Sequence, residues 1–259
     1  MGRGAYGTVE FWDEWYAEDD HADYDWLLAW DDFGEAIESL IGDHDKRVLV
    51  VGCGNSPFSS ELFARGYRNV VNVDNCESII AVQRLRYPML RWLVGDVRSL
   101  PFNDGSFDLV LDKGCLDNLY CYVDTTAAVA AFIRETRRLL RAESGRFVVV
   151  SCHDEATTRD SLSLANWRFS ILRVPNPRWP RIRVETYELA LCETGASDHD
   201  LAAVLGAAVA RTRLCRRDDT LAAAAATTGR CGTGSLPSRL AHLERRSSGR
   251  RHSDLIGDE

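Results

Sequence analysis

The sequence lacks the spacings by which cysteine and histidine usually hold a metal ion. Its eight cysteines form no C-x-x-C pair, and its six histidines show neither H-x-x-x-H nor H-E-x-x-H. Several cysteines lie inside apolar strand patterns, which indicates small buried side chains in a reducing compartment. We therefore expect free thiols and no metal site.

Long apolar runs are absent as well. No stretch approaches the roughly 20 apolar residues that a membrane-spanning helix needs. The first residues lack the basic and apolar blocks of a signal peptide. Hydrophobic residues make up 45% of the 259 residues and charged residues 27%, which is typical of a soluble globular protein. These features predict a cytoplasmic protein without a membrane partner.

Lysine is nearly missing, because only Lys46 and Lys113 are present and arginine supplies the other positive charges. The net charge is −8, and the segment 10–45 holds fourteen acidic residues without one lysine or arginine. This balance predicts no nucleic-acid binding by the main domain. The acidic segment would attract a basic partner, although a solvated acidic face is the commoner explanation of such a run.

Apolar strand patterns alternate with helical patterns through much of the chain. Strand patterns occur at 47–52, 69–74, 90–96, 107–114 and 146–152, and helical patterns at 56–66, 76–88 and 124–145. Such alternation implies right-handed βαβ crossovers and a parallel sheet. Two further strand patterns, 166–175 and 183–193, have no strong helical pattern between them, which predicts an antiparallel hairpin. The expected fold class is α/β, a Rossmann-like three-layer sandwich with a seven-stranded, mostly parallel sheet and a C-terminal antiparallel hairpin.

Composition divides the chain into three parts. Residues 1–46 form an aromatic and acidic arm with a helix, and residues 47–195 form the sheet domain. Residues 196–259 contain alanine runs and patches of glycine, serine and arginine but no aromatic residue, so we expect a low-complexity, disordered tail. Alanine propensity allows a partial helix within 200–228.

The loop after the first strand pattern has the glycine spacing of a nucleotide-binding turn but no phosphate site. Gly52 and Gly54 fit the first two positions of G-x-G-x-x-G, whereas Pro57 stands where a dinucleotide site needs the third glycine. Proline offers no N–H group to a phosphate. No G-K-[ST] is present either, which excludes a P-loop. The loop therefore suits close backbone approach to a ligand without phosphate groups.

Two acidic residues at strand ends predict what that ligand contains. Asp74 ends the second strand pattern, where a carboxylate can bind the hydroxyls of an unphosphorylated ribose. Asp96 ends the third, and its carboxylate with the N–H of Val97 can pair with an adenine edge. Together these features describe adenosine joined to something small and polar, and S-adenosylmethionine (AdoMet) fits.

Five stretches of the sequence resemble one group of enzymes. They are VEFWDEWYAEDDHADYDWL (9–27), VLVVGCGNS (48–56), VVNVDNCESII (70–80), GDVRSLPFNDGSFDLVLDKGCLDNL (95–119) and SGRFVVVSC (144–152). In them the chain is similar to the seven-strand (class I) AdoMet-dependent methyltransferases. Within these it resembles the methyltransferase-like group that includes lysine and N-terminal methyltransferases of translation elongation factor 1-alpha. The combination of E-[FY]-W-D-x-x-Y, G-C-G-N-S and D-K-G-x-L-D is specific to this group.

This resemblance implies a set of cofactor-binding residues on the arm and at the strand ends. They are Trp12, Tyr16 and Trp26 on the arm, Gly52, Gly54 and Lys113 at the methionine end, Asp74 and Asn75 at the ribose, and Asp96 and Val97 at the adenine. Trp15 and Trp30 we assign to packing. Cys115 and Asn118 depart from the threonine and the small residue that are usual in the group, which leaves the substrate open.

The resemblance also predicts a protein-lysine methyltransferase that acts on a translation factor such as elongation factor 1-alpha, as a monomer. A lysine acceptor has to lose a proton first, and a nearby carboxylate can orient the amine. Asp112 and Asp117 are the candidates, with alternative roles as a turn or cap residue and as a helix N-terminal acid. The alternative functions are a small-molecule methyltransferase and a catalytically silent AdoMet-binding scaffold on the same fold.

Overall fold

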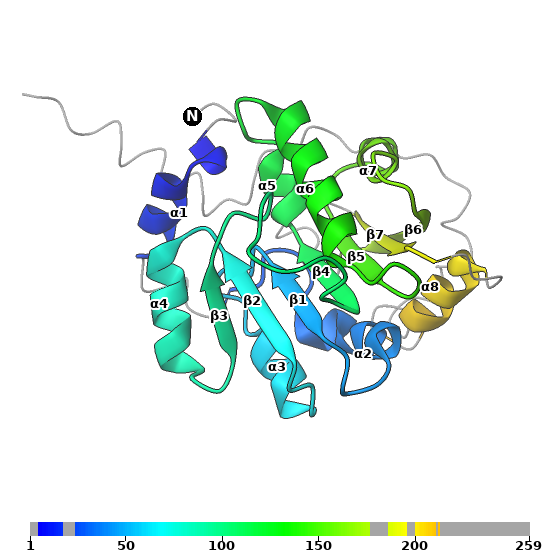
Figure 1. The fold of residues 1–259 in the computed structure, drawn as a ribbon, viewed down its shortest axis with the longest axis horizontal. Helices are drawn as coiled ribbons and strands as arrows, with labels where there is room; N and C mark the ends of the chain where they lie inside the picture. The colour runs from blue at the N-terminus through cyan, green and yellow to red at the C-terminus, as the bar shows by residue number, and fades with distance from the viewer. Residues whose placement is uncertain (1–4, 18–23, 177–185, 196–199, 211, 213–259) are drawn as a thin grey trace, which may run out of the picture.

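Seven strands form one sheet in the computed structural model of the chain, which describes residues 5–17, 24–176, 186–195, 200–210 and 212 (Figure 1). The strands are β1 (Val48–Val51), β2 (Val70–Asp74), β3 (Arg91–Val94), β4 (Leu109–Lys113), β5 (Arg146–Ser151), β6 (Arg168–Pro175) and β7 (Thr186–Glu193). Their order is β3-β2-β1-β4-β5-β7-β6. Strands β1 to β5 are parallel, and β7 pairs antiparallel with both β5 and β6.

Helices cover the sheet and its carboxyl edge. They are α1 (Val9–Tyr16), α2 (Trp30–Ile41), α3 (Phe58–Ala64), α4 (Glu77–Arg86), α5 (Cys115–Leu119), α6 (Thr125–Leu139), α7 (Glu155–Leu162) and α8 (Leu201–Ala210), preceded by a 3₁₀ turn, η1 (Ala5–Gly7). In the described part of the chain, none of them combines the length and the apolar character that crossing a membrane requires.

The side chains of the central strand β1 contribute to two hydrophobic cores, one on each face of the sheet. Val48 and Val50 pack in the core formed with α2, α3, α4 and α8, whereas Leu49 and Val51 pack in the core formed with α5, α6 and α7. Successive side chains of a strand point to opposite faces, so a strand that is apolar throughout is buried on both sides. The molecule therefore has three layers, and the predicted fold class, including the antiparallel hairpin, is confirmed.

The helix expected over 124–145 begins as predicted but ends earlier. The Asp124 carboxylate accepts a hydrogen bond from the N–H of Ala127 at 3.1 Å and caps the first turn of α6. The helix stops at Leu139, because Leu140 adopts an extended conformation and forms a parallel β-bridge with Phe107. A tertiary contact therefore determines this helix end.

Helix α7, between β5 and β6, was not expected. Its sequence, EATTRDSL, offers few apolar residues to a pattern search. Its first turn is capped by Asp154, whose carboxylate accepts from the N–H of Thr157 at 2.8 Å. Asp154 was the one feature of the sequence that could have indicated this helix start, and a capping residue alone is a weak indication when no apolar stripe follows.

Helix α8 lies inside the segment that we assigned to a tail, where a partial helix was allowed. Leu201, Leu205, Ala208 and Val209 are buried in the same core as α2, so the helix packs against the sheet domain. The rest of the expected tail, 196–199, 211 and 213–259, lies outside the described residues, as do the first residues of the last predicted strand pattern.

The packing of α8 predicts a measurable contribution to stability. Leu205 is fully buried, so Leu205→Ala should lower the free energy of unfolding by about 2–4 kcal/mol through lost contacts and a residual cavity. The matched control, Ala203→Ser, alters an exposed position of the same helix and should change it by less than about 0.5 kcal/mol. Urea unfolding measures both. Equal stability of Leu205→Ala and the wild type would show that α8 is dispensable.

Candidate functional site

The loop between β1 and α3 holds two glycines with positive backbone φ, Gly52 at 57° and Gly54 at 49°. A Cβ atom on Gly52 would lie 2.8 Å from the Cβ of Cys115, and one on Gly54 would lie 2.6 Å from the hydroxyl of Tyr16. Both distances are too short for unbonded atoms. The two glycines therefore allow α5 and the arm to approach the loop at the carboxyl edge of the sheet.

Asp74 connects this loop to the start of α4. Its Oδ2 accepts a hydrogen bond from the N–H of Gly54 at 2.9 Å, and its Oδ1 accepts one from the N–H of Cys76 at 3.0 Å. Burial raises the pKa of Asp74, and these hydrogen bonds partly offset that rise. Each carboxylate oxygen has a second lone pair, so Asp74 keeps acceptor capacity for ribose hydroxyls. Asn75, also predicted at the ribose, follows it directly.

Asp96 lies just beyond β3, and its side chain is 45% exposed. Arg98 binds it with two groups, Nη2 at 2.6 Å from Oδ2 and Nε at 2.9 Å from Oδ1. The hydrogen bonds from Arg98 lower the pKa of Asp96, so the group is a carboxylate. The side chain of Val97 packs in the core that contains α6. Sequence reasoning did not include Arg98, which holds the predicted adenine acceptor in place.

The arm carries a cluster of aromatic rings beside the glycine loop. The ring centroid of Trp12 lies 5.4 Å from that of Trp26 and 5.8 Å from that of Tyr16. Burial raises the pKa of Tyr16 well above its usual range, so its phenol stays protonated. The Nε1 of Trp26 is buried and has no hydrogen-bond partner among the described residues. Trp15 and Trp30 are buried, in agreement with their assignment to packing.

Polar contacts from η1 and α1 also hold the arm to the sheet domain. On α1, Asp13 accepts hydrogen bonds from the hydroxyl of Ser78 at 2.6 Å and from the thiol of Cys76 at 2.8 Å. On η1, the carbonyl oxygen of Tyr6 accepts from the amide of Asn118 at 2.5 Å. The arm therefore contacts both α4 and α5, and Asn118, which departs from the usual residue of the related group, makes one of these contacts.

Lys113, at the end of β4, forms a buried ion pair. Its Nζ lies 2.7 Å from Oδ1 of Asp25, and the two side chains are only 9% and 7% exposed. The same Oδ1 accepts a hydrogen bond from the hydroxyl of Ser56 at 2.5 Å. Asp25 was missing from our predicted site, because nothing in its spacing shows that it meets a residue so far along the chain.

Asp112, the first candidate for the catalytic carboxylate, is completely buried under α5. Its Oδ1 accepts from the N–H of Cys115 at 2.7 Å and its Oδ2 from the N–H of Leu116 at 2.9 Å. Burial, followed by the charge of Asp117, raises the pKa of Asp112 to about 8. This geometry is that of the cap residue which we considered as its alternative role.

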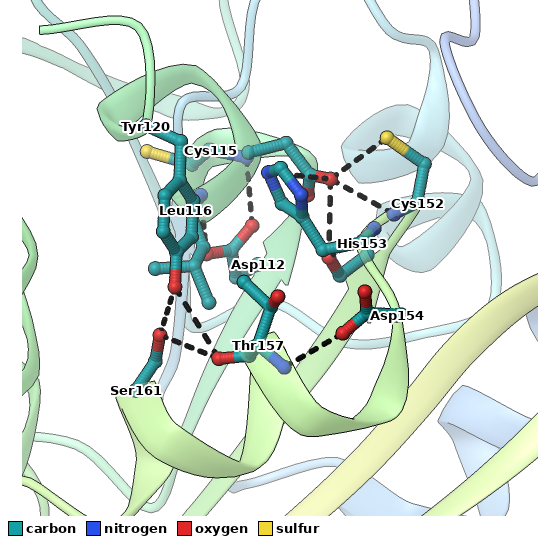
Figure 2. A network of polar contacts seen from close by, with 11 residues as sticks. Asp112, Cys115, Leu116, Tyr120, Cys152, His153, Asp154, Thr157 and Ser161 are labelled. Atoms are coloured by element: carbon teal, nitrogen blue, oxygen red, sulfur yellow. Dashed lines mark hydrogen bonds and ion pairs between the residues drawn. The ribbon is translucent and has the colours of Figure 1, made fainter. Parts of the chain in front are cut away.

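Asp117, the second candidate, lies on α5 and faces the end of β5. Its Oδ1 accepts from the N–H of Cys152 at 2.8 Å and from the hydroxyl of Ser151 at 3.0 Å. Its Oδ2 is buried and has no hydrogen-bond partner in the described part of the chain. The ring of His153 lies beside that of Tyr120 at a tilt of 57°, with ring centroids 4.3 Å apart (Figure 2). The Nε2 of His153 lies 3.9 Å from Oδ1 of Asp117. A buried acceptor without a partner is costly, and a donor on a bound molecule would relieve that cost.

These residues fit AdoMet in their chemistry. Asp74 and Asp96 offer acceptors for hydroxyl and amino groups, and Trp26 offers a buried donor that has no partner in the part of the chain that the structure describes. The aromatic cluster suits a sulfonium cation, because a ring face attracts positive charge. Among the described residues, no three histidine, cysteine or acidic side chains come together as metal ligands would.

Comparisons with known proteins agree with this assignment. The methyltransferase domain family matches residues 49–149. EEF1A lysine methyltransferase 4 of Mus musculus is 43% identical over 116 residues, which are 43% of this chain and 45% of that protein. The eEF1A lysine and N-terminal methyltransferase of Homo sapiens is 31% identical over 152 residues, 56% of this chain and 22% of that protein. The chain thus spans less than half the length of these relatives.

One solved structure adds support for the fold. A methyltransferase from Haloferax volcanii, solved in complex with the Trm112 methyltransferase activator, superposes with a TM-score of 0.54 at 16% identity. The match covers 73% of this chain and 98% of that one. Residues 49–149 thus match the methyltransferase domain family, and the chain shares the fold of that solved structure. In this fold, the glycine loop, Asp74 and Asp96 all lie at the carboxyl ends of β1 to β3, where open α/β sheets bind their ligands.

The raised pKa of Asp112 predicts a pH effect on stability. An unfolded aspartate titrates at about 3.9, so at intermediate pH the folded state holds a proton that the unfolded state has released. The free energy of unfolding then falls as pH rises. Asp112→Asn removes the titration, so the wild type should lose stability relative to this variant between about pH 5 and pH 8. Urea unfolding across that range measures the difference. Parallel pH profiles would contradict the buried proton.

Proposed function

We propose that this chain is an AdoMet-dependent protein-lysine methyltransferase that acts on elongation factor 1-alpha. The observation that carries the proposal is the buried Oδ2 of Asp117, which lies beside the carboxyl edge of the sheet and has no hydrogen-bond partner among the described residues. That oxygen can accept a hydrogen bond from an entering amine. The relatives from Mus musculus and Homo sapiens, which are named for lysine methylation of this factor, support the choice of substrate.

AdoMet, when bound, supplies a methyl group that its sulfonium already activates for transfer. In our proposal Asp74 accepts hydrogen bonds from the ribose hydroxyls, with Asn75 beside it. Asp96 and the N–H of Val97 bind the adenine edge. Gly52, Gly54 and Lys113 take the methionine end, and Trp12, Tyr16 and Trp26 exclude water. The protein thus contributes alignment and desolvation rather than bond chemistry.

The acceptor side requires a neutral amine. Desolvation at the carboxyl edge lowers the pKa of an entering lysine, because burial disfavours its charged form. Asp117 accepts one N–H of that amine and thereby turns the nitrogen lone pair toward the methyl group. In this proposal Asp112 does not contact the amine, because both of its oxygens accept hydrogen bonds from backbone N–H groups at the start of α5. It holds the helix that carries Asp117.

Charge on the arm suits a basic protein substrate. Glu10 and Glu14 on α1 and Asp31 and Glu35 on α2 are exposed, and they belong to the long acidic segment. Acidic surfaces speed the encounter with basic partners at low ionic strength. We further propose that the enzyme works as a monomer in the cytoplasm, where elongation factors act.

The cofactor assignment predicts a graded effect of two substitutions. Asp74→Ala should weaken AdoMet binding about 10–100-fold, as expected when an acceptor for hydroxyl groups is lost from a buried site. Asp96→Ala should weaken it less, about 3–10-fold, because this carboxylate is exposed and shared with Arg98. The control Asp104→Asn changes an acid that is 82% exposed and should have no effect. Calorimetry measures all three, and unchanged affinity in both site variants would refute the assignment.

The role of Asp117 predicts a loss of turnover without a loss of cofactor. In Asp117→Asn the amide oxygen can keep the hydrogen bonds of Oδ1, while an NH₂ group replaces the buried Oδ2. Turnover on elongation factor 1-alpha should fall about 100-fold, and the AdoMet affinity should stay within about threefold of wild type. Asp160→Asn, an exposed acid on α7, is the charge-matched control. Wild-type turnover in Asp117→Asn would contradict the proposed role.

The substrate itself is tested with radiolabelled AdoMet, purified elongation factor 1-alpha and cell lysate. We expect label in the protein band of the factor, and mass spectrometry should locate it on a lysine. Label found only in small molecules would favour the small-molecule methyltransferase. No transfer at all, combined with normal AdoMet binding, would favour the silent scaffold.

A further inference from the structure

Asp25 joins three segments that are distant in sequence. It belongs to the arm, it accepts a hydrogen bond from Ser56 in the loop after β1, and it pairs with Lys113 at the end of β4. Its neighbour in the chain is Trp26, whose ring centroid lies 4.9 Å from that of Trp15. The Asp25 carboxylate therefore anchors the aromatic part of the arm to the carboxyl edge of the sheet.

The burial of this ion pair makes its charge balance important. Both side chains are at least nine-tenths buried, and removing one partner of such a pair leaves the other charge without compensation. Without the Asp25 carboxylate, the ammonium of Lys113 would stand unbalanced at the end of β4. An unbalanced cation in a buried place repels other cations more strongly than it would in water.

AdoMet and its product, S-adenosylhomocysteine, differ in charge. The two ligands share the adenosine and the amino-acid groups, but only AdoMet carries the positive sulfonium. An uncompensated Lys113 would attract the carboxylate group that both ligands have, and it would do so equally for each. It would repel the sulfonium, which only AdoMet has. The relative affinity for the two ligands therefore reports the charge state of the Asp25–Lys113 pair.

We propose that Asp25 is a positioning residue with two effects: it fixes the arm against β4, and it balances Lys113 so that the site accepts the cationic AdoMet. This inference rests on the proposed function for the identity of the ligand, and it assigns a role to a residue outside the predicted cofactor contacts. Asp25 acts through Lys113 and through the arm.

The first test compares Asp25→Asn with the wild type by calorimetry, using AdoMet and S-adenosylhomocysteine in turn. Asn has the shape of Asp but no charge. We expect the dissociation constant for AdoMet to rise about 10-fold more than that for S-adenosylhomocysteine, as like-charge repulsion in a buried site implies. An equal change for both ligands, or no change, would overturn the balancing role.

Three further variants separate charge from general loosening of the arm. Asp13→Asn removes an arm contact to α4 but leaves Lys113 paired, so it should affect both ligands equally. Asp25→Asn combined with Lys113→Met removes the unbalanced cation and should return the ratio of the two dissociation constants toward wild type. Asp25→Glu keeps the charge and should keep the ratio, and it serves as the second variant if Asp25→Asn does not fold. Persistence of the altered ratio in the double variant would contradict the role of Lys113.

The second test needs no ligand. Hydrogen exchange of residues 24–29 should become about 10-fold faster in Asp25→Asn than in the wild type, because the local opening of that segment becomes easier. In Asp13→Asn the faster exchange should fall in α1 instead. Unchanged exchange at 24–29 would overturn the anchoring role. If the wild type bound neither ligand, the proposed function would fail, and hydrogen exchange alone would still decide whether Asp25 holds the arm.

Discussion

The carboxylate of Asp74 accepts backbone N–H groups from two different loops, and the geometry of the whole carboxyl edge depends on this. One donor is Gly54, after β1, and the other is Cys76, at the start of α4. Because one rigid group holds both, the glycine loop and α4 keep a fixed separation. Tyr16 can then occupy the space above Gly54 in which any other residue would place its Cβ. Loop, helix and arm thus form one unit around a single buried acid.

The arm extends this unit across the edge of the sheet. Asp13 connects it to α4, the carbonyl of Tyr6 connects it to α5 through Asn118, and Asp25 connects it to β4. The contacts fall on α4, β4 and α5, which are all distant in sequence from the arm. In our account this is how a short aromatic segment can exclude water from a methyl transfer, which needs alignment and a dry site more than it needs reactive side chains.

Much of this could be predicted from the sequence, and the exceptions have physical reasons. Apolar strand patterns that alternate with helical patterns predicted the sheet, because parallel strands buried on both faces are apolar along their whole length. Helix α7 left little signal, because its residues are mostly polar and only its cap is distinctive. The strand-end acids Asp74 and Asp96 were predictable from topology, but Asp25 was not, since its partner Lys113 is met only in the folded chain. Asp112 is a different case, because its hydrogen-bond partners Cys115 and Leu116 follow it closely in the chain, and the sequence already allowed the cap role that the structure shows.

The central claim is that this edge binds adenosine carrying an amino acid and has no place for phosphate groups. Calorimetric titration of the wild-type chain tests it most directly, with AdoMet in one experiment and the dinucleotide NAD in another. The account predicts binding of one AdoMet per chain and no heat of binding for NAD, because Pro57 stands where a phosphate site would need glycine. Binding of NAD, or the absence of AdoMet binding, would contradict it.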